Sequence, residues 1–212
     1  MKKPVVKEIL EWGYCFIIAF IVAILVKYFV GAPTVVKQQS MNTTLLEGQR
    51  LWLNRIPRTF NQEYKRGDII TFEAPSTPIP SLEQINYEYP VAIYDYKIDN
   101  IFEKFCYYVL ETGKKSYIKR IIGIAGDHVR IEAGKVYLNE KLLEEPYLDE
   151  GVTTINAGQY IDVIVPENCV FVMGDNREHS TDSRSFGCIP IEKIESRVGI
   201  RFWPFSKFGK VE

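Results

Sequence analysis

The sequence predicts a mainly β protein: a partly closed β-barrel or sandwich behind one N-terminal transmembrane helix, with a small helical insertion. Three observations lead to this fold class. A long apolar run lies near the N-terminus, seven short segments rich in β-branched and aromatic residues follow it, and a longer segment in the middle breaks that pattern. With 212 residues, the chain has the length of one medium domain plus an appendage.

The apolar run comprises residues 12–30, WGYCFIIAFIVAILVKYFV, and has no charged residue before Lys27. A bilayer requires about 20 mostly apolar residues, so we expect a membrane anchor over residues 12–33. Lys27 lies near one end, where its long side chain can reach the membrane interface. Two alternatives stay open. One is a cleaved signal peptide, although Gly31 and Ala32 make no clear small-x-small site; the other is a buried core helix.

Three lysines, Lys2, Lys3 and Lys7, precede the apolar run. Basic residues next to a membrane span favour the cytoplasmic side. We therefore expect residues 1–11 in the cytoplasm and residues 34–212 outside it, as an extracytoplasmic domain. The expected location is the cell membrane, with a single pass and with lipid around the anchor.

Short apolar segments dominate the chain after the anchor. Gly-Asp and Ala-Gly pairs follow several of them, as expected of tight turns. Many short strands joined by tight turns are typical of a sandwich or a partly closed barrel. The expected strands are RLWLN, DIITF, SYIKRIIGI, HVRIEAGKVYLN, YIDVIV, CVFVMG and VGIRFW.

Residues 74–116 break the β pattern and form the expected insertion. A proline-rich loop opens this segment, and a stretch of helical periodicity ends near a capping glycine, Gly113. Asp99, Glu103 and Lys104 fall on the polar face of this helix. The insertion either buries its own apolar face or is a lid or membrane-contacting element beside a site. Its apolar face consists of Ile98, Ile101, Phe102, Phe105, Tyr108 and Val109.

The charge balance and the cysteine spacing exclude several classes of protein. Lys and Arg number 26 and Asp and Glu 27, so the basic excess typical of nucleic-acid binders is missing. The four cysteines, with the two histidines, have no zinc-site spacing, and we expect neither a metal nor another cofactor. Cys169 and Cys188 are a conceivable disulfide, which the sequence leaves open because it carries no geometry.

One serine, Ser40, follows the anchor closely in the segment QQSMNTTL. A serine hydroxyl is a weak nucleophile until a base accepts its proton. The only imidazoles are His128, at an expected strand start, and His179, in the segment GDNREHSTDSR. Asp175 and Asp182 lie near His179 in sequence, but nothing fixes their geometry toward it. A histidine base is therefore the weaker hypothesis.

A buried lysine is the alternative base. The reference pKa of lysine is about 10.4, and burial in an apolar setting lowers it by up to 3–5 units. Lys119 lies within the apolar strand segment SYIKRIIGI, where alternation places it on the face of Ile121. From periodicity alone, Lys119 is equally well explained as an ordinary surface lysine on an edge strand.

The chain resembles the bacterial type I signal peptidases of the Ser/Lys class. Four segments carry the resemblance, in the expected order behind an anchor, and together they span most of residues 36–200. The last two are long and specific. The segments are SMNTTL (40–45), RGDIITF (66–72), YIKRIIGIAGD (117–127) followed by GKVYLN, and MGDNREHSTDSRSFG (173–187).

The resemblance implies a role for each matching residue. Ser40 would be the nucleophile, with its backbone N–H as an oxyanion donor, and Lys119 the general base and acid. Ser180 would hydrogen-bond the lysine amine and aim it. The remaining matches divide into two groups. Arg120, Asp175, Asp182 and Arg184 would form structural ion pairs, and Val36, Met41, Leu45, Tyr117, Ile118 and Val172 would line shallow apolar substrate pockets.

The implied function is that of a membrane-anchored serine endopeptidase. It would remove signal peptides from secretory precursor proteins after small-x-small sites. The sequence departs from the family pattern at three positions. Thr43 and Ala125 replace prolines, and Gln38 stands where some relatives have a serine as second oxyanion donor, so rate and substrate preference are in doubt.

Two other functions remain as alternatives. A self-cleaving Ser/Lys protein related to stress-response repressors would need a cleavage site in its own chain, and the anchor and the charge balance disfavour it. An inactive relative acting as a membrane-bound scaffold would have lost the serine or the lysine, and both are present.

Overall fold

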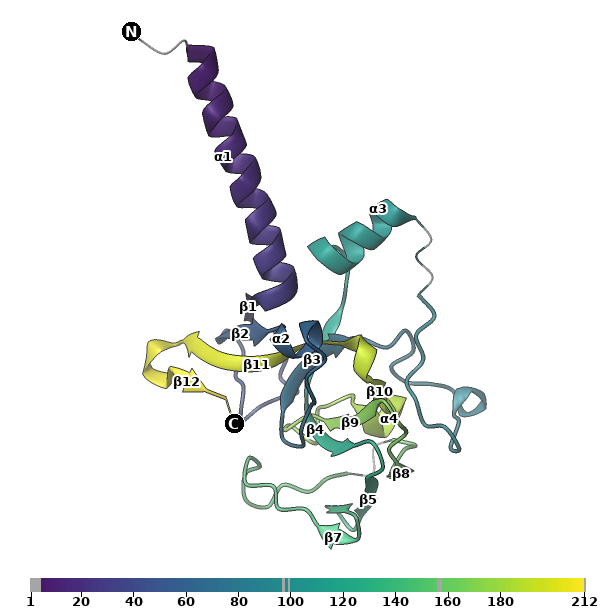
Figure 1. Cartoon of the computed structure of the whole chain (residues 1–212). Helices are drawn as coiled ribbons and strands as arrows, with labels where there is room; N and C mark the ends of the chain where they lie inside the picture. The colour runs from purple at the N-terminus through teal and green to yellow at the C-terminus, as the bar shows by residue number, and fades with distance from the viewer. Residues whose placement is uncertain (1–4, 97, 99, 156–157, 212) are drawn as a thin grey trace.

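The computed structural model describes residues 5–96, 98, 100–155 and 158–211. A long helix, α1 (Val5–Leu25), continues into a π-helical turn, η1 (Val26–Val30), and projects away from the β domain (Figure 1). The 24 residues Lys7–Val30 are long and apolar enough to cross a membrane, and none of this stretch is buried in the protein. That exposure rules out the buried core helix. Lys2 and Lys3 lie outside the described residues.

The larger of the two sheets has eight antiparallel strands. Its order is β1-β2-β11-β3-β4-β9-β10, and the short β12 pairs with β11. A smaller four-stranded sheet has the order β7-β6-β5-β8. The strands of the large sheet are β1 (Gly31–Val35), β2 (Arg50–Asn54), β3 (Ile69–Glu73), β4 (Ser116–Ile124), β9 (Cys169–Met173), β10 (Ile189–Pro190), β11 (Ile194–Trp203) and β12 (Gly209–Lys210). Those of the small sheet are β5 (His128–Glu132), β6 (Lys135–Leu138), β7 (Lys141–Leu142) and β8 (Asp162–Ile164).

The mainly β fold expected from the sequence is confirmed. Strands β3 and β9 are buried at every position because core residues cover both of their faces, and β4 lies between them. Within the described ranges the strands form two open sheets, so the barrel does not close. Short helical turns connect them: α2 (Ile56–Thr59), η2 (Leu82–Gln84), α4 (Ser183–Phe186), η4 (Ile191–Lys193) and η5 (Phe205–Lys207).

The insertion contains the expected helix, as α3 (Ile101–Lys104) continued by the π-helical η3 (Phe105–Leu110). The expected cap is wrong: the helix ends at Glu111, in the left-handed conformation, rather than at Gly113. The apolar face is not buried, which overturns the view that the insertion covers itself. Ile101 and Phe102 are 85% and 68% exposed. Asp99, expected on the polar face, lies outside the described residues.

The four cysteines are free thiols. Cys169 and Cys188 are buried in one core cluster between the two sheets, together with Phe171 and Met173. Burial raises the pKa of both thiols, which keeps them protonated. The disulfide that the sequence left open is therefore not formed.

Candidate active site

Ser40 and Lys119, 79 residues apart in sequence, meet in the structure. The Lys119 Nζ lies 2.7 Å from the Ser40 Oγ and 3.1 Å from the carbonyl oxygen of Ile118. Lys119 is held by β4, opposite Ile70 of β3. Ser40 lies in a turn after β1, which a hydrogen bond from the Leu45 N–H to the Met41 carbonyl closes at 2.8 Å. Lys119 therefore lies in an otherwise apolar strand, and its amine contacts the serine hydroxyl.

The Lys119 side chain is buried, with only 1% of the residue exposed. Burial lowers its pKa from 10.5 to about 8, because the charged form loses its water. The Asp182 and Asp175 carboxylates act in the opposite direction, and the Arg184 guanidinium adds to the lowering. A lysine with this pKa is half neutral at about pH 8 and can then accept a proton from the serine hydroxyl.

The first expected ion pair fixes the strand to the serine turn. The Arg120 guanidinium donates two hydrogen bonds to the Asp175 carboxylate, at 3.0 and 2.8 Å, and a third to the carbonyl of Gly67 at 3.1 Å. The Thr44 hydroxyl donates to the same carboxylate at 2.6 Å. Since Arg120 follows Lys119 and Thr44 follows Ser40 by four residues, Asp175 links the base to the nucleophile loop.

A second ion pair joins Arg184 and Asp182, whose charges both act on Lys119. The Arg184 Nε and Nη2 donate to Asp182 at 2.8 and 2.9 Å, and the Gly174 N–H donates to Asp182 at 3.0 Å. Burial alone would raise the pKa of Asp182, but the Arg184 guanidinium and the Gly174 N–H hold it below its usual range. Asp182 is therefore a buried anion near the amine, fully partnered by its own loop.

Ser180 does not make the contact expected of it. Its Oγ is buried and has no hydrogen-bond partner of normal geometry in the described part of the chain. The hydroxyl lies against the α-carbon of Gly174, with the Ser40 carbonyl oxygen on the same side. Ser180 thus reaches the site, but its bond to the Lys119 amine is not formed in this state.

Two further residues of this loop, which the sequence reasoning did not single out, support the site: Asn176 holds the serine turn and Arg177 holds the loop itself. Asn176 donates through its backbone N–H to the Ser40 carbonyl and through Nδ2 to the Gln39 carbonyl, each at 3.1 Å. Arg177 is fully buried, donates to the Gly174 carbonyl at 3.1 Å and pairs with Glu145. Both residues belong to the GDNR motif (174–177), and this position in the sequence could have identified them as site residues.

Comparison with known proteins places this geometry in a family. Residues 9–203 match the family of signal peptidases, peptidase S26. The chain belongs to the signal peptidase S26 family. Signal peptidase IB of Staphylococcus aureus (strain COL) is 32% identical over 95% of this chain and 93% of its own length. A probable signal peptidase I-2 of Synechocystis sp. is 32% identical over 94% of this chain and 76% of its own length.

A solved structure is also similar to this signal peptidase. The crystal structure of a signal peptidase I from Enterococcus faecalis V583 matches with a TM-score of 0.40 and 22% identity, covering 64% of this chain and 96% of that one. Signal peptidases of this family cleave signal peptides from secreted precursors with a Ser/Lys dyad. The chain is accordingly a serine peptidase, and its apolar helix α1 anchors it to a membrane.

A cavity of about 440 Å³ opens over the dyad of this signal peptidase. Gln38 and Tyr117, two of the residues expected at the site, line it. His179, the candidate base of the weaker hypothesis, also lines the cavity, as does Thr181, to which the sequence reasoning had given no role. The complete lining is Gln38, Gln39, Ser40, Tyr117, Lys119, His179 and Thr181.

Three residues expected to line the substrate pockets are core residues instead. Met41, Leu45 and Val172 have no exposed surface. Met41 and Leu45 point inward because the turn after Ser40 places both on one side, and Val172 lies on a strand with both faces covered. Val36 is nearly buried in the same cluster as Met41, and Ile118 packs against that cluster while remaining partly exposed.

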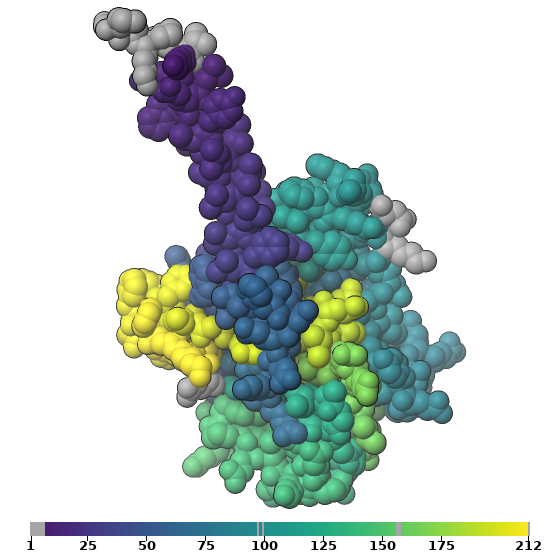
Figure 2. All heavy atoms as spheres, in the orientation of Figure 1, coloured from purple at the N-terminus to yellow at the C-terminus, as the bar shows by residue number. Residues whose placement is uncertain are grey.

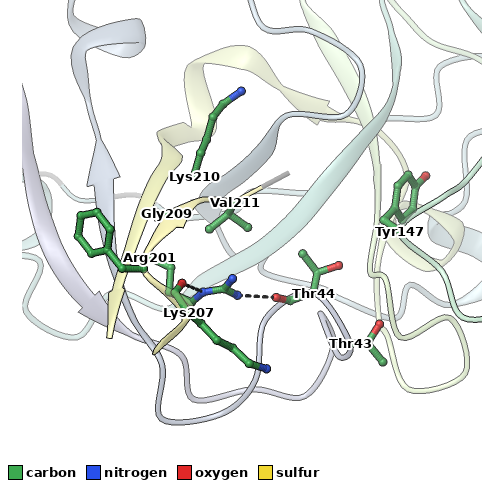
Figure 3. A pocket seen from close by; sticks show the side chains of 9 residues that line it. Thr43, Thr44, Tyr147, Arg201, Lys207, Gly209, Lys210 and Val211 are labelled. Atoms are coloured by element: carbon green, nitrogen blue, oxygen red, sulfur yellow. Dashed lines mark hydrogen bonds between the residues drawn. The ribbon is translucent and has the colours of Figure 1, made fainter. Parts of the chain in front are cut away.

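The C-terminal strand β11 contacts the turn that carries Ser40. Figure 3 shows a second cavity, of about 540 Å³, between Thr43, Thr44 and the β11–β12 hairpin. Arg201 crosses it and donates to the Thr44 carbonyl at 3.3 Å and to the Lys207 carbonyl at 2.8 Å. In the described part of the chain, no three His, Cys, Asp or Glu side chains gather to hold a metal.

Proposed function

We propose that this signal peptidase cleaves its precursors with Ser40 as nucleophile and Lys119 as general base. The observation that carries the proposal is the 2.7 Å distance between the Lys119 Nζ and the Ser40 Oγ, at a buried lysine whose pKa is lowered to about 8. A neutral amine at hydrogen-bond distance accepts the hydroxyl proton as the oxygen attacks the scissile carbonyl. The positively charged Lys119 then gives that proton to the leaving amine, and water hydrolyses the acyl-enzyme.

The oxyanion would be held by the Ser40 backbone N–H and the Gln38 side-chain amide. Gln38 is exposed on the rim of the cavity over the dyad, two residues before the nucleophile. An amide aimed at the developing negative charge stabilises the transition state more than the ground state. Ser180 would orient Lys119, because among the described residues no hydrogen bond of normal geometry occupies its buried hydroxyl.

The substrate would bind as an extended segment across the cavity over the dyad. We assign Tyr117, Ile118 and the edge of Val36 to the small apolar pockets, since Tyr117 lines the cavity and Ile118 is partly exposed on the same strand. Small pockets exclude large side chains by volume, which would give cleavage after small-x-small sites. The substrates are then secretory precursor proteins.

The topology follows from the anchor and the basic residues before it. Residues 1–11 would lie in the cytoplasm, residues 12–33 would cross the cell membrane, and residues 34–212 would form the extracytoplasmic catalytic domain, with the insertion at about 74–116. The positive-inside rule supports this orientation. Ser40 then lies ten residues after Val30, the end of the apolar helix, at the surface where a precursor presents its cleavage site.

Cleavage of a purified secretory precursor in lipid tests the proposal. The wild-type enzyme, Ser40→Ala and Lys119→Ala are compared, and the new N-terminus is read by mass spectrometry. We expect cleavage after a small-x-small site by the wild type alone. Cleavage that persists in either variant would remove that residue from the dyad, and a folded but inactive wild type would favour the scaffold function.

A further inference from the structure

The insertion carries an apolar surface that the protein itself leaves uncovered. We define the insertion patch as Ile101, Phe102, Phe105, Tyr108 and Leu110, on α3 and η3. Each of these side chains is exposed, Ile101 most of all. Exposed apolar patches mark interaction sites, because contact of apolar surface with water is unfavourable.

The insertion patch lies beside the end of the membrane anchor. Figure 1 shows α3 raised above the β domain on the side from which α1 projects, and Figure 2 shows the atoms of the insertion next to the base of α1. The contact is polar and specific. The Lys27 Nζ donates to the Leu110 carbonyl at 3.2 Å and pairs with Glu111 at 3.1 Å.

The base of α1 is itself fastened to the β domain. Arg58 donates to the Tyr28 carbonyl at 2.6 Å, and the Thr59 hydroxyl donates to the Phe29 carbonyl at 2.7 Å. Arg55 pairs with Glu111 and donates to the Lys27 carbonyl at 3.2 Å. Anchor, domain and insertion therefore meet at one polar junction, which fixes the height of the insertion patch relative to the span.

The length of the span determines the level of the bilayer relative to the β domain. A helix of 24 residues is about 36 Å long, more than the hydrocarbon core of about 30 Å. Its last turn, with Lys27, lies at the interface, and α3 rises from that level alongside the helix. Because the Lys27 junction holds the insertion next to the end of the span, a bilayer around α1 would lie close to the insertion patch.

We propose that the insertion patch is a second membrane-binding element, which inserts into the interfacial region of the leaflet from which the catalytic domain emerges. Its partner is the lipid bilayer. Glu103 and Lys104 on the same helix are exposed and polar, the arrangement of a helix that lies in the plane of an interface. The bilayer then holds the domain at two points, which fixes its tilt and the height of Ser40 above the lipid.

Fluorescence quenching by lipid tests this directly. Cys15 and Cys106 are replaced by serine, and an environment-sensitive label is attached to Phe102→Cys in liposomes with nitroxide-labelled lipids. The buried Cys169 and Cys188 do not react in the folded protein. Leu82→Cys is the matched control: it is an apolar position of the same insertion, 76% exposed, in the short turn η2 outside the insertion patch. Val22→Cys, within the span, reports insertion of the anchor.

We expect position 102 to be quenched at least threefold more than position 82, with strong quenching at position 22. Water-like emission and no quenching at position 102, with position 22 quenched, would overturn the proposal while leaving the anchor intact. Loss of quenching at position 22 would overturn the anchoring on which this inference rests. The assignment of Ser40 and Lys119 is not affected by any of these results.

A kinetic experiment separates lipid from substrate as the partner. The variant Ile101→Ser/Phe102→Ser is compared with Leu82→Ser on a membrane-inserted precursor and on a short soluble peptide. We expect a three- to tenfold loss for the inserted precursor in the first variant only, with the soluble peptide cleaved normally, which also shows that the variant folds. The same loss without lipid quenching at position 102 would mean that the patch binds the apolar helix of the precursor, and would overturn the lipid proposal.

Discussion

Gly174 and Ser40 approach so closely that a methyl group on the Gly174 α-carbon would overlap the Ser40 carbonyl oxygen. The same methyl group would overlap the Ser180 hydroxyl. A glycine is needed here for this close approach of two loops, which brings the nucleophile turn and the Asp175–Asp182 loop to their observed distance.

Gly174→Ala should therefore separate the two loops and lower kcat by about 100-fold, because a displacement of about 1 Å costs that much in a positioned site. Initial rates on a soluble peptide measure the effect. Gly199→Ala is the matched control: its new methyl group would lie 3.3 Å from the nearest atom, the Trp52 carbonyl oxygen, and far fewer contacts would shift. Equal activity of both variants would contradict the steric account.

The pH dependence of kcat should follow Lys119. Because burial lowers the lysine pKa to about 8, the neutral base is about one tenth of the population at pH 7 and nearly all of it above pH 9. The rate should rise about tenfold per pH unit below pH 8 and level off above it. Single-turnover measurements between pH 6 and 10 test this, and a flat profile with chemistry rate-limiting would exclude lysine as the base.

Lys119→Met should stabilise the folded protein at neutral pH while abolishing activity. A pKa of about 8 in the folded state, against 10.5 unfolded, means that the unfolded chain binds more protons, so the buried lysine costs on the order of 3 kcal/mol at pH 7. The cost should shrink as the pH rises from 8 to 10.5. Denaturant unfolding of both proteins at pH 7 and pH 10 gives the difference, and a destabilised variant at pH 7 would refute it.

Ser180→Ala should lower kcat 10- to 100-fold with little change in KM. Within the described ranges the buried hydroxyl has no hydrogen bond of normal geometry, so its removal should leave the melting temperature unchanged or slightly raised. A positioning role also predicts a shift of the kinetic pKa, since the hydroxyl would bond one protonation state of Lys119 more strongly. A normal rate and an unchanged pH profile would remove Ser180 from the site.

The sequence predicted which polar residues meet at the site better than it predicted which apolar residues are buried. The family resemblance implied a Ser40–Lys119 dyad and ion pairs among Arg120, Asp175, Asp182 and Arg184, and the structure brings these residues together as Ser40–Lys119, Arg120–Asp175 and Arg184–Asp182. Burial was harder to predict. An apolar residue suits a core and a substrate pocket equally well, so Met41, assigned to a pocket, proved to be core.

The insertion is a case in which apolar residues predicted on one helical face proved to be exposed. Helical periodicity predicted an apolar face that includes Ile101 and Phe102, and the helix forms where it was expected. Periodicity states which residues share a face but not what covers that face. The observed exposure depends on the junction of Lys27 with Glu111, two residues 84 positions apart, which local patterns do not reveal.

The unpaired Cys169 and Cys188 have a practical consequence. Since both thiols are sealed in the core between the two sheets, the folded domain owes none of its stability to oxidation and should tolerate reductants. Unfolding exposes both at once, and chains opened by heat without a reductant would cross-link and fail to refold. A thiol reagent added to the native enzyme therefore reacts at these positions only as fast as the core opens. The reaction rate of the two cysteines thus measures the rate at which the core opens.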